Sequence, residues 1–216
     1  MNNNITEQQL DTLKEELRLK MSEKRFNHTI MVEQMAITLG KIYAPSKITQ
    51  LRTAALLHDV TKEFKTEKQL EIMQKFNYNL KPIYRCVPKS HHAITASLLI
   101  PVMYSQFADK TVIDAVRYHT TGKSNMNITE KIIYLADYID LSRTFPDCIT
   151  VRNYFFEKYK DSMTKKELSL LLLDTLILSF DMTIKNLTDE DSVIAPETIN
   201  ARNSLIIERI KTNESK

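Results

Sequence analysis

Histidine and aspartate residues set within apolar segments are the residues of this sequence best suited to chemistry. His58 and Asp59 directly follow the apolar residues 54–57, and Asp137 interrupts an apolar helical pattern at 132–138. A carboxylate in such surroundings is expected to be buried, and a buried charge requires a partner. A divalent cation is one such partner, although an isolated His-Asp pair is also typical of an exposed helix end.

All five histidines lie within the first 119 residues: His28, His58, His91, His92 and His119. Taken singly, each is more typical of a satisfied core or surface residue than of a metal ligand. Together with Asp59 and Asp137, they supply imidazoles and carboxylates from separate segments, as metal sites in the cores of helical proteins do. The sequence therefore indicates a candidate metal site.

The elements that must position these residues are predicted to be helices. Apolar residues recur at helical spacing along nearly the whole chain, and only 2 glycines and 6 prolines occur in 216 residues. We predict an all-α fold, a helical bundle in a single domain that spans residues 1–216 with its core at about 8–210, because this length suits one domain better than two.

Apolar spacing and capping residues give the expected helix boundaries. The predicted helices cover 10–21, 22–40, 45–59, 66–73, 92–103, 111–119, 127–141, 151–159, 165–186 and from 198 onward. Ser22 and Asn127 are expected N-caps, and Thr66 with Gln69 is expected to form a capping box. The second helix is expected to end near Gly40. Residues 76–90 are predicted to be irregular, 120–122 to form a turn, and 212–216 to be a polar end.

Composition narrows the range of partners. The net charge is +3 with no concentrated basic block, so a nucleic-acid polymer is not expected, whereas an anionic small molecule is compatible with it. The longest apolar stretch, 168–180, contains Asp174 and is too short to span a membrane. Cys86 and Cys148 lack metal-ligand spacing, and Met1 is followed by polar residues instead of a signal peptide. A cytoplasmic protein with reduced thiols is expected.

Four segments carry a resemblance to a known family. They are RFNHT at 25–29, AALLHDVTK at 54–62, RYHTTG at 117–122 and IYLADYID at 133–140, with His92-Ala93 between the second and third. In order and spacing, the chain resembles the HD-domain phosphohydrolases of the YqeK type, described as symmetrical diadenosine tetraphosphate hydrolases. The His-Asp pair marks only the superfamily, whereas the HTTG turn and the following YLADY helix are far more specific.

The resemblance implies a ligand set. His28, His58, Asp59 and Asp137 would hold one metal, and His92 and His119 a second, with Asp59 bridging the two. Two irons are the cofactor that the family suggests, while nitrogen and oxygen ligands would also admit manganese, cobalt or zinc. His92 is preferred over its neighbour His91 because Ala93 follows it, and His91 is interpreted as an outer or surface residue.

The resemblance also implies an activity and substrate contacts. A metal-activated hydroxide would attack an inner phosphorus of diadenosine tetraphosphate and release two ADP, with Asp59 and Lys62 as the catalytic residues. Lys62 and Arg143 would hold the polyphosphate, although a solvated charge is an equal interpretation of each. Thr120, Thr121 and Gly122 would approach the phosphates, which is compatible with a plain helix-ending turn whose glycine is left-handed.

One departure and several alternatives stay open. Asp140-Leu141-Ser142-Arg143 stands where the family usually has Glu-Pro and then Arg, so a contact of the shorter Asp140 would be weakened. Another nucleotide phosphohydrolase, such as a nucleoside-phosphate phosphatase, is the alternative enzyme. A non-catalytic regulator that binds metal and nucleotide, and a metal-free helical interaction protein, are the alternatives outside enzymes. The resemblance also suggests a homodimer.

Overall fold

The computed structural model describes residues 5–214, and none of these residues lies in a strand. The helices are α1 (Glu7–Lys20), α2 (Glu23–Tyr43), α3 (Ile48–Leu57), α4 (Thr66–Lys75), α5 (His91–Met103), α6 (Lys110–Tyr118), α7 (Ile128–Ile139), α8 (Pro146–Lys158), α9 (Lys165–Asp189) and α10 (Pro196–Glu214). Short 3-10 turns occupy Pro45–Lys47, Pro82–Cys86, Pro88–Ser90 and Ser105–Phe107. The predicted all-α fold is confirmed.

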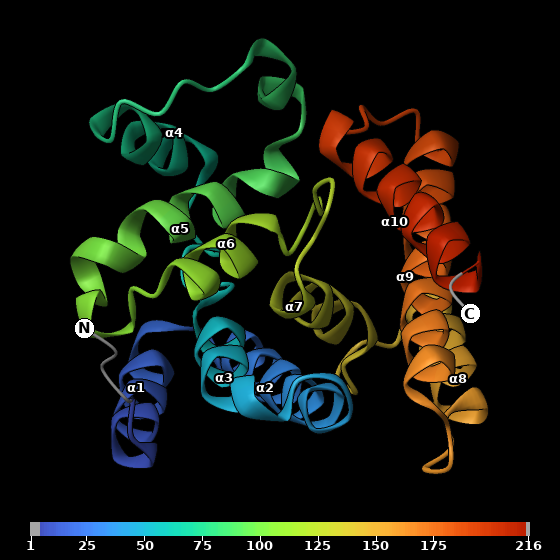
Figure 1. The fold of residues 1–216 in the computed structure, drawn as a ribbon. Helices are drawn as coiled ribbons and strands as arrows, with labels where there is room; N and C mark the ends of the chain where they lie inside the picture. The colour runs from blue at the N-terminus through green and yellow to red at the C-terminus, as the bar shows by residue number, and fades with distance from the viewer. Residues whose placement is uncertain (1–4, 215–216) are drawn as a thin grey trace.

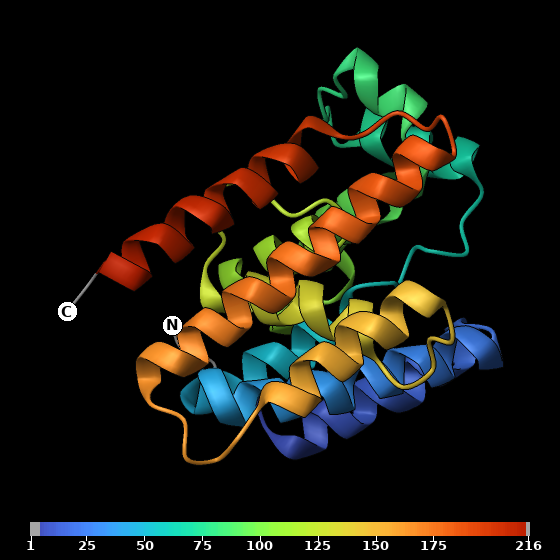
Figure 2. The ribbon, with the colours of Figure 1, turned by 90° about the vertical axis from the view of Figure 1, so that its right-hand side faces the viewer.

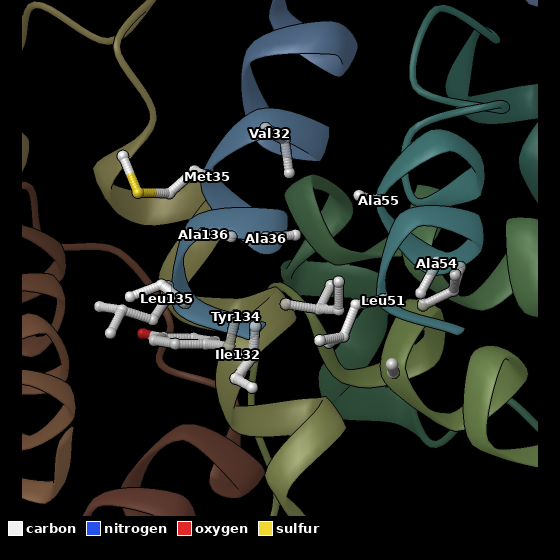
Figure 3. Packing of buried hydrophobic residues seen from close by; sticks show 14 of the residues in the cluster. Val32, Met35, Ala36, Leu51, Ala54, Ala55, Ile132, Tyr134, Leu135 and Ala136 are labelled. Atoms are coloured by element: carbon white, nitrogen blue, oxygen red, sulfur yellow. The ribbon is translucent and has the colours of Figure 1, made fainter. Parts of the chain in front are cut away.

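The centre of the molecule is formed by α2, α3 and α7, which pack against one another (Figure 3). Their facing sides carry small side chains, among them Ala36, Ala54, Ala55 and Ala136, all fully buried. Small residues let helix axes approach closely, so the segments that carry the candidate ligands are held near each other. The packing of these three helices therefore sets the geometry of the candidate site.

The C-terminal helices form a separate side of the bundle (Figure 1). The long helix α9 lies between α8 and α10, and Figure 2 shows the three running alongside one another. Phe180 of α9 stacks on Tyr134 of α7, with ring centroids 4.2 Å apart. One cluster of buried hydrophobic residues extends from Leu10 to Leu205, so this side shares its core with the central helices.

Two predicted helix caps and the glycine turn are confirmed. The hydroxyl of Ser22 accepts a hydrogen bond from the Arg25 amide at 3.2 Å, and Asn127 caps α7 with Glu130 completing a capping box. Gly122 is left-handed, with φ of 62°. A Cβ at Gly122 would lie 2.5 Å from the Phe180 ring and 2.8 Å from the Ala201 Cβ. Glycine is therefore required there for two reasons, backbone conformation and close packing against α9 and α10.

Two local predictions are wrong. Helix α2 continues past Gly40 to Tyr43, and a Cβ at Gly40 would meet Leu51 Cδ1 at 2.6 Å, so this glycine permits close approach of α3 instead of ending the helix. Thr66 is the first residue of α4 and makes no capping bond. The Gln69 side chain instead donates to the Phe64 carbonyl at 2.9 Å, stabilising the preceding turn.

Some helix ends differ from their predicted positions. Helix α8 begins at Pro146 and α10 at Pro196, because proline is favoured in the first turn, where it needs no amide partner. The last helix continues to Glu214, so the polar end predicted for 212–216 is helical as far as it is described, and residues 215–216 lie outside the described part. Within 5–214, no helix is both long and apolar enough to cross a bilayer.

Candidate active site

Five separate segments deliver the six predicted metal ligands to one place. His28 lies in the second turn of α2, and His58 and Asp59 directly follow the end of α3. His92 is in the first turn of α5, His119 follows α6, and Asp137 lies near the end of α7. The structure therefore brings together all six side chains that the resemblance implied.

His28, His58 and Asp137 form the first group of candidate ligands. One ligand atom from each lies within 4.8 Å of the others. The Nε2 of His28 is 3.1 Å from Asp137 Oδ1, and the Nε2 of His58 is 3.7 Å from the same oxygen. Asp59 Oδ2 faces this group, at 3.3 Å from His58 Nε2 and 3.7 Å from His28 Nε2. This arrangement matches the predicted first metal position.

A second group lies on the other side of the Asp59 carboxylate. Its Oδ1 atom is 3.1 Å from His92 Nε2 and 3.6 Å from His119 Nε2, and the two imidazole nitrogens are 3.0 Å apart. Each oxygen of Asp59 thus faces a different pair of histidines. This position between two sets of imidazoles is compatible with the bridging role expected of Asp59.

Contacts on the outer side of the rings fix how the imidazoles point. The Nδ1 of His58 lies 2.6 Å from the Ala55 carbonyl, and the Nδ1 of His119 lies 2.7 Å from the Val116 carbonyl. A carbonyl can only accept, so each Nδ1 carries the proton and each Nε2 presents its lone pair to the cluster. These are the tautomers that metal-binding histidines adopt.

His28 is oriented by polar side chains instead of a carbonyl. Its Nδ1 lies 3.4 Å from Asp140 Oδ2 and 3.2 Å from the Ser142 hydroxyl. Asp140 is fully buried and also accepts from the Ser142 amide at 2.8 Å. The shorter side chain in the position of the usual glutamate therefore still reaches His28, through the outer contact expected of a histidine ligand.

Unsatisfied polar atoms indicate that the cluster fits a cation. The Nε2 atoms of His28 and His58 and the Oδ1 of Asp59 are buried and make no hydrogen bond. Leaving such atoms without a partner is unfavourable, and in native proteins they are rare. All three belong to the candidate ligand set and face the same space. The donor set of nitrogens and carboxylate oxygens suits a divalent transition metal.

Both aspartates are held in the charged form. Burial raises the pKa of Asp59, but the nearby imidazoles of His58 and His119 outweigh it and bring the pKa well below its usual range. Burial likewise opposes ionisation of Asp137, but the Arg143 guanidinium and His28 hold its pKa well below the usual range. Two ionised carboxylates among imidazoles offer a cation both negative charge and nitrogen and oxygen donors.

His28 differs in charge from the two histidines of the second group. Burial lowers the pKa of His92 to about 4 and also lowers the pKa of His119, so both are neutral near pH 7 and have free lone pairs. Burial also disfavours the charged form of His28, but the nearby carboxylates of Asp137 and Asp140 outweigh it and raise the pKa of His28 to about 9. A metal at the first position would displace this proton.

Three cationic side chains surround the cluster. Arg25 hydrogen-bonds Asp59 Oδ2, and Arg143 hydrogen-bonds Asp137 Oδ1 and lies 3.2 Å from Asp140 Oδ2. Lys62 Nζ lies 3.3 Å from His92 Nε2, and burial lowers the pKa of this amine. Sequence reasoning assigned no role to Arg25. Arg25 lies three residues before His28, on the same face of α2, and this spacing is the sequence feature that could have predicted its place beside the cluster.

A cavity of ≈ 530 Å³ opens beside the cluster. Its walls include Lys62, Thr120, Thr121 and Arg143, four of the five predicted substrate contacts, together with His119 and Asp137 of the candidate metal centre. Gly122 does not line it, because its Cα faces Phe180 and Ala201 behind the turn. The glycine therefore shapes the turn that presents the two threonines.

His91 is buried, so its interpretation as a surface residue is wrong. The side chain is 1% exposed, and its Nε2 lies 2.7 Å from the Tyr84 carbonyl. It thereby tethers the turn Pro82–Cys86 to the start of α5 and takes no part in the cluster of His92. Adjacent residues at a helix start point in different directions, which separates the roles of the two histidines.

Comparison with known proteins now agrees with this geometry. The HD domain family matches residues 25–142, the segment that contains all six candidate ligands. The chain belongs to the HD-domain family. The resemblance seen in the sequence motifs is confirmed, and so is the class that it implied, a hydrolase of the HD type.

Several relatives extend the match beyond the HD segment. A protein of Halalkalibacterium halodurans is 30% identical over 189 residues, covering 88% of this chain and 92% of the relative. A protein of Bacillus subtilis is 33% identical over 134 residues, covering 62% and 70%. Both are named bis(5'-nucleosyl)-tetraphosphatase, symmetrical.

A solved structure from Clostridium acetobutylicum is similar along nearly the whole chain. It superposes with a TM-score of 0.79 at 32% identity, covering 92% of this chain and 97% of that one. It is described as a predicted HD superfamily hydrolase involved in NAD metabolism. The helices that follow residue 142 are therefore part of the shared fold.

Proposed function

We propose that this chain is a metal-dependent hydrolase that cleaves diadenosine tetraphosphate symmetrically into two ADP. The observation that carries the proposal is the Asp59 carboxylate, whose two oxygens face two separate pairs of histidines. It is supported by the names of relatives that cover most of the chain. Two irons are the proposed cofactor, with manganese, cobalt and zinc as alternatives.

The proposed ligands are the six residues His28, His58, Asp59, His92, His119 and Asp137. When bound, divalent cations lower the pKa of water and stabilise the charge that develops on phosphoryl oxygens. The protein contributes the orientation of each ligand, through the outer contacts of the imidazoles. Asp59, which faces both groups, is the residue on which the proposed site depends most.

The residues beside the metal ligands would bind the substrate's phosphates. Lys62 and Arg143 line the ≈ 530 Å³ cavity and lie against the cluster, where an anionic chain would find two fixed cations. Arg143 offers a planar fork for bidentate contact with phosphate oxygens. Thr120 and Thr121 lie on the same wall and offer hydroxyl groups.

The leaving group suits a site that offers cationic side chains and does not need a general acid. Cleavage at an inner phosphorus releases ADP, whose terminal oxygen is a weakly basic phosphate and does not require a strong proton donor. Lys62 and Arg143 can stabilise its charge as the bond breaks. We propose this electrostatic role for Lys62 in place of general acid catalysis.

Product analysis tests the proposal directly. The purified chain, loaded in turn with iron, manganese and cobalt, is incubated with diadenosine tetraphosphate, AMP, ADP and NAD. Formation of two ADP from the first supports the proposal. ATP with AMP, phosphate released only from mononucleotides, or cleavage of NAD alone would reject it in favour of another nucleotide phosphohydrolase. NAD is included because of the description of the Clostridium acetobutylicum protein.

Elemental analysis separates the enzyme from the other classes. A helical interaction protein predicts no bound metal. A non-catalytic regulator predicts bound metal and nucleotide without turnover under any of these conditions. The enzyme predicts that metal content and turnover are lost together when Asp137 is changed to Ala.

A further inference from the structure

Two cavities share the same pair of cationic side chains, Lys62 and Arg143. The first is the ≈ 530 Å³ cavity bounded by α7 and α9, and the second, of ≈ 720 Å³, lies between the start of α2 and residues 142–145. Both cavities are lined by these two residues, and among residues 5–214 no other is shared between them. Candidate metal ligands open onto each, with Asp137 and His119 on the first and His28 and Asp59 on the second.

The walls of the two cavities differ in chemistry. The first combines polar and charged residues with a group of apolar and aromatic ones, among them Tyr134, Tyr138, Leu187 and Val193. The second is lined by charged and polar residues of the first turns of α2, and its one aromatic residue is Phe145. Each volume is in the range of about 300–1,000 Å³ that a drug-sized group fills. The site is therefore bipartite and asymmetric.

We propose that the second cavity binds the second nucleoside of a dinucleoside polyphosphate, while the first cavity holds the first. This inference rests on the proposed function and adds where each half of the substrate lies. The phosphate chain would cross Lys62 and Arg143, the only residues common to both cavities. Scission in the middle of the chain then follows from the position of the candidate metal centre between the two nucleosides.

Phe145 is suited to contact a base. Its side chain is 63% exposed and directly precedes α8, so the ring is not required for core packing. An exposed aromatic ring on a cavity wall gives a stacking surface that any nucleobase can use. The open setting of this ring contrasts with Tyr134, which is buried against Phe180.

Arg25 and Asn27 supply polar contacts in the same cavity. The Nη1 of Arg25 is bound to Asp59, and the Arg25 side chain lines this cavity, which places a further positive charge beside the proposed path of the phosphates. Asn27 is exposed and forms no side-chain hydrogen bond with any residue in the described range 5–214. Its amide can both donate to and accept from a ribose or base.

The decisive experiment compares two nucleotides that differ only in the second nucleoside. Diadenosine tetraphosphate carries an adenosine at each end of its four phosphates, whereas adenosine 5′-tetraphosphate carries four phosphates and a single adenosine. In the Phe145→Ala variant, loss of a stacking contact is expected to raise KM for the dinucleotide about tenfold. The kcat/KM for the mononucleoside compound is expected to stay unchanged.

Phe156→Ala is the matched control. Phe156 lies on α8, the helix that Phe145 directly precedes, is 41% exposed and lines neither cavity. The control is expected to leave both substrates unaffected, and circular dichroism confirms that both variants keep the wild-type helix content. An equal effect of Phe145→Ala on the two nucleotides, or no effect on either, overturns the inference.

Failure of the proposed function has a different signature. If the wild-type chain hydrolyses neither nucleotide, the proposed activity is wrong, and the inference is decided by equilibrium binding of the same two nucleotides. Wild type must then bind the dinucleotide more tightly than the mononucleoside compound, and Phe145→Ala must remove that preference. Equal affinities of wild type for both would reject the second nucleoside site.

Discussion

The HD segment and the C-terminal helices contribute to the candidate site in different ways. The segment matched by the family, 25–142, provides all six candidate metal ligands. It also contains Arg25 and Lys62, two of the three surrounding cationic residues, and the third, Arg143, directly follows it. Helices α8 to α10 provide no candidate ligand, but α9 and α10 wall the first cavity through Leu187 and Thr198. The candidate metal ligands are thus concentrated in the first region, whereas the second shapes the cavity that is available to a substrate.

The two regions are also stabilised differently. Around the candidate metal centre, charged groups are paired in buried or half-buried positions, such as Arg25 with Asp59 and Arg143 with Asp137. In the C-terminal region, the aromatic stack of Phe180 on Tyr134 joins α9 to α7, and the polar contacts with α7, such as Lys131 with Glu208, lie away from the candidate ligands. Substitutions in the first region should therefore affect metal and chemistry, and those in the second should affect stability or substrate affinity.

The largest expected effect comes from Asp59→Asn. The amide is uncharged and has only one oxygen, so it cannot place an anionic oxygen at both groups of candidate ligands. A loss of several kcal/mol of transition-state stabilisation is therefore expected, on the order of a thousandfold in kcat/KM. Metal content should fall in parallel. Hydrolysis assays with diadenosine tetraphosphate measure kcat/KM, and elemental analysis measures the metal content.

Asp174→Asn is the control, because Asp174 lies on α9 and pairs only with Arg209 in the part of the chain that is described. It should retain wild-type metal content and rate. Full metal content in Asp59→Asn would show that Asp59 is not a bridging ligand and would remove the contrast between the two regions.

Gly122→Ala tests the junction of the regions. The substitution places a Cβ at a left-handed residue and against Phe180 and Ala201, so the free energy of unfolding is expected to fall by about 2–4 kcal/mol. Denaturant unfolding measures it, with the exposed Ser124→Ala in the same turn as the control. A change below about 0.5 kcal/mol, as is usual for surface substitutions, would mean that the C-terminal helices are not tightly docked on this turn.

Asp140→Asn is expected to weaken metal binding without removing it. Asp140 orients His28 from behind, and loss of such an outer partner typically lowers metal affinity by about 10–100-fold. Titration of the protein with metal, monitored by calorimetry, measures the affinity. Unchanged affinity would show that Ser142, at 3.2 Å from the same nitrogen, is sufficient to orient the ring.

Leu187→Ala should have the smallest effect, confined to the substrate. Leu187 lies on the wall of the first cavity and is distant in sequence from every candidate ligand. Removing its apolar atoms is expected to raise KM by about tenfold or less, at about 0.8 kcal/mol per buried CH₂ lost, with kcat and metal content unchanged. A fall in metal content would contradict the division between the two regions.

Local sequence signals determined much of the helical framework. Ser22 and Asn127 act as caps because a side-chain oxygen reaches amides two or three residues away, within the same stretch of chain. The left-handed Gly122 follows from the same local logic, whereas Thr66 fails as a cap because the Gln69 side chain bonds the preceding turn instead. The candidate ligands were found through motifs whose residues lie at fixed spacing.

Tertiary structure alone decided which groups meet. Arg25 acquires a role through contact with Asp59, 34 residues later in the chain, and His91 differs from His92 because Tyr84 folds back over it. The second cavity joins the start of α2 to residues beyond α7, which no pattern in either segment indicates. Caps and turns depend on neighbours in the chain, whereas cavities and buried ion pairs depend on which helix faces pack together, and this is a property of the whole core.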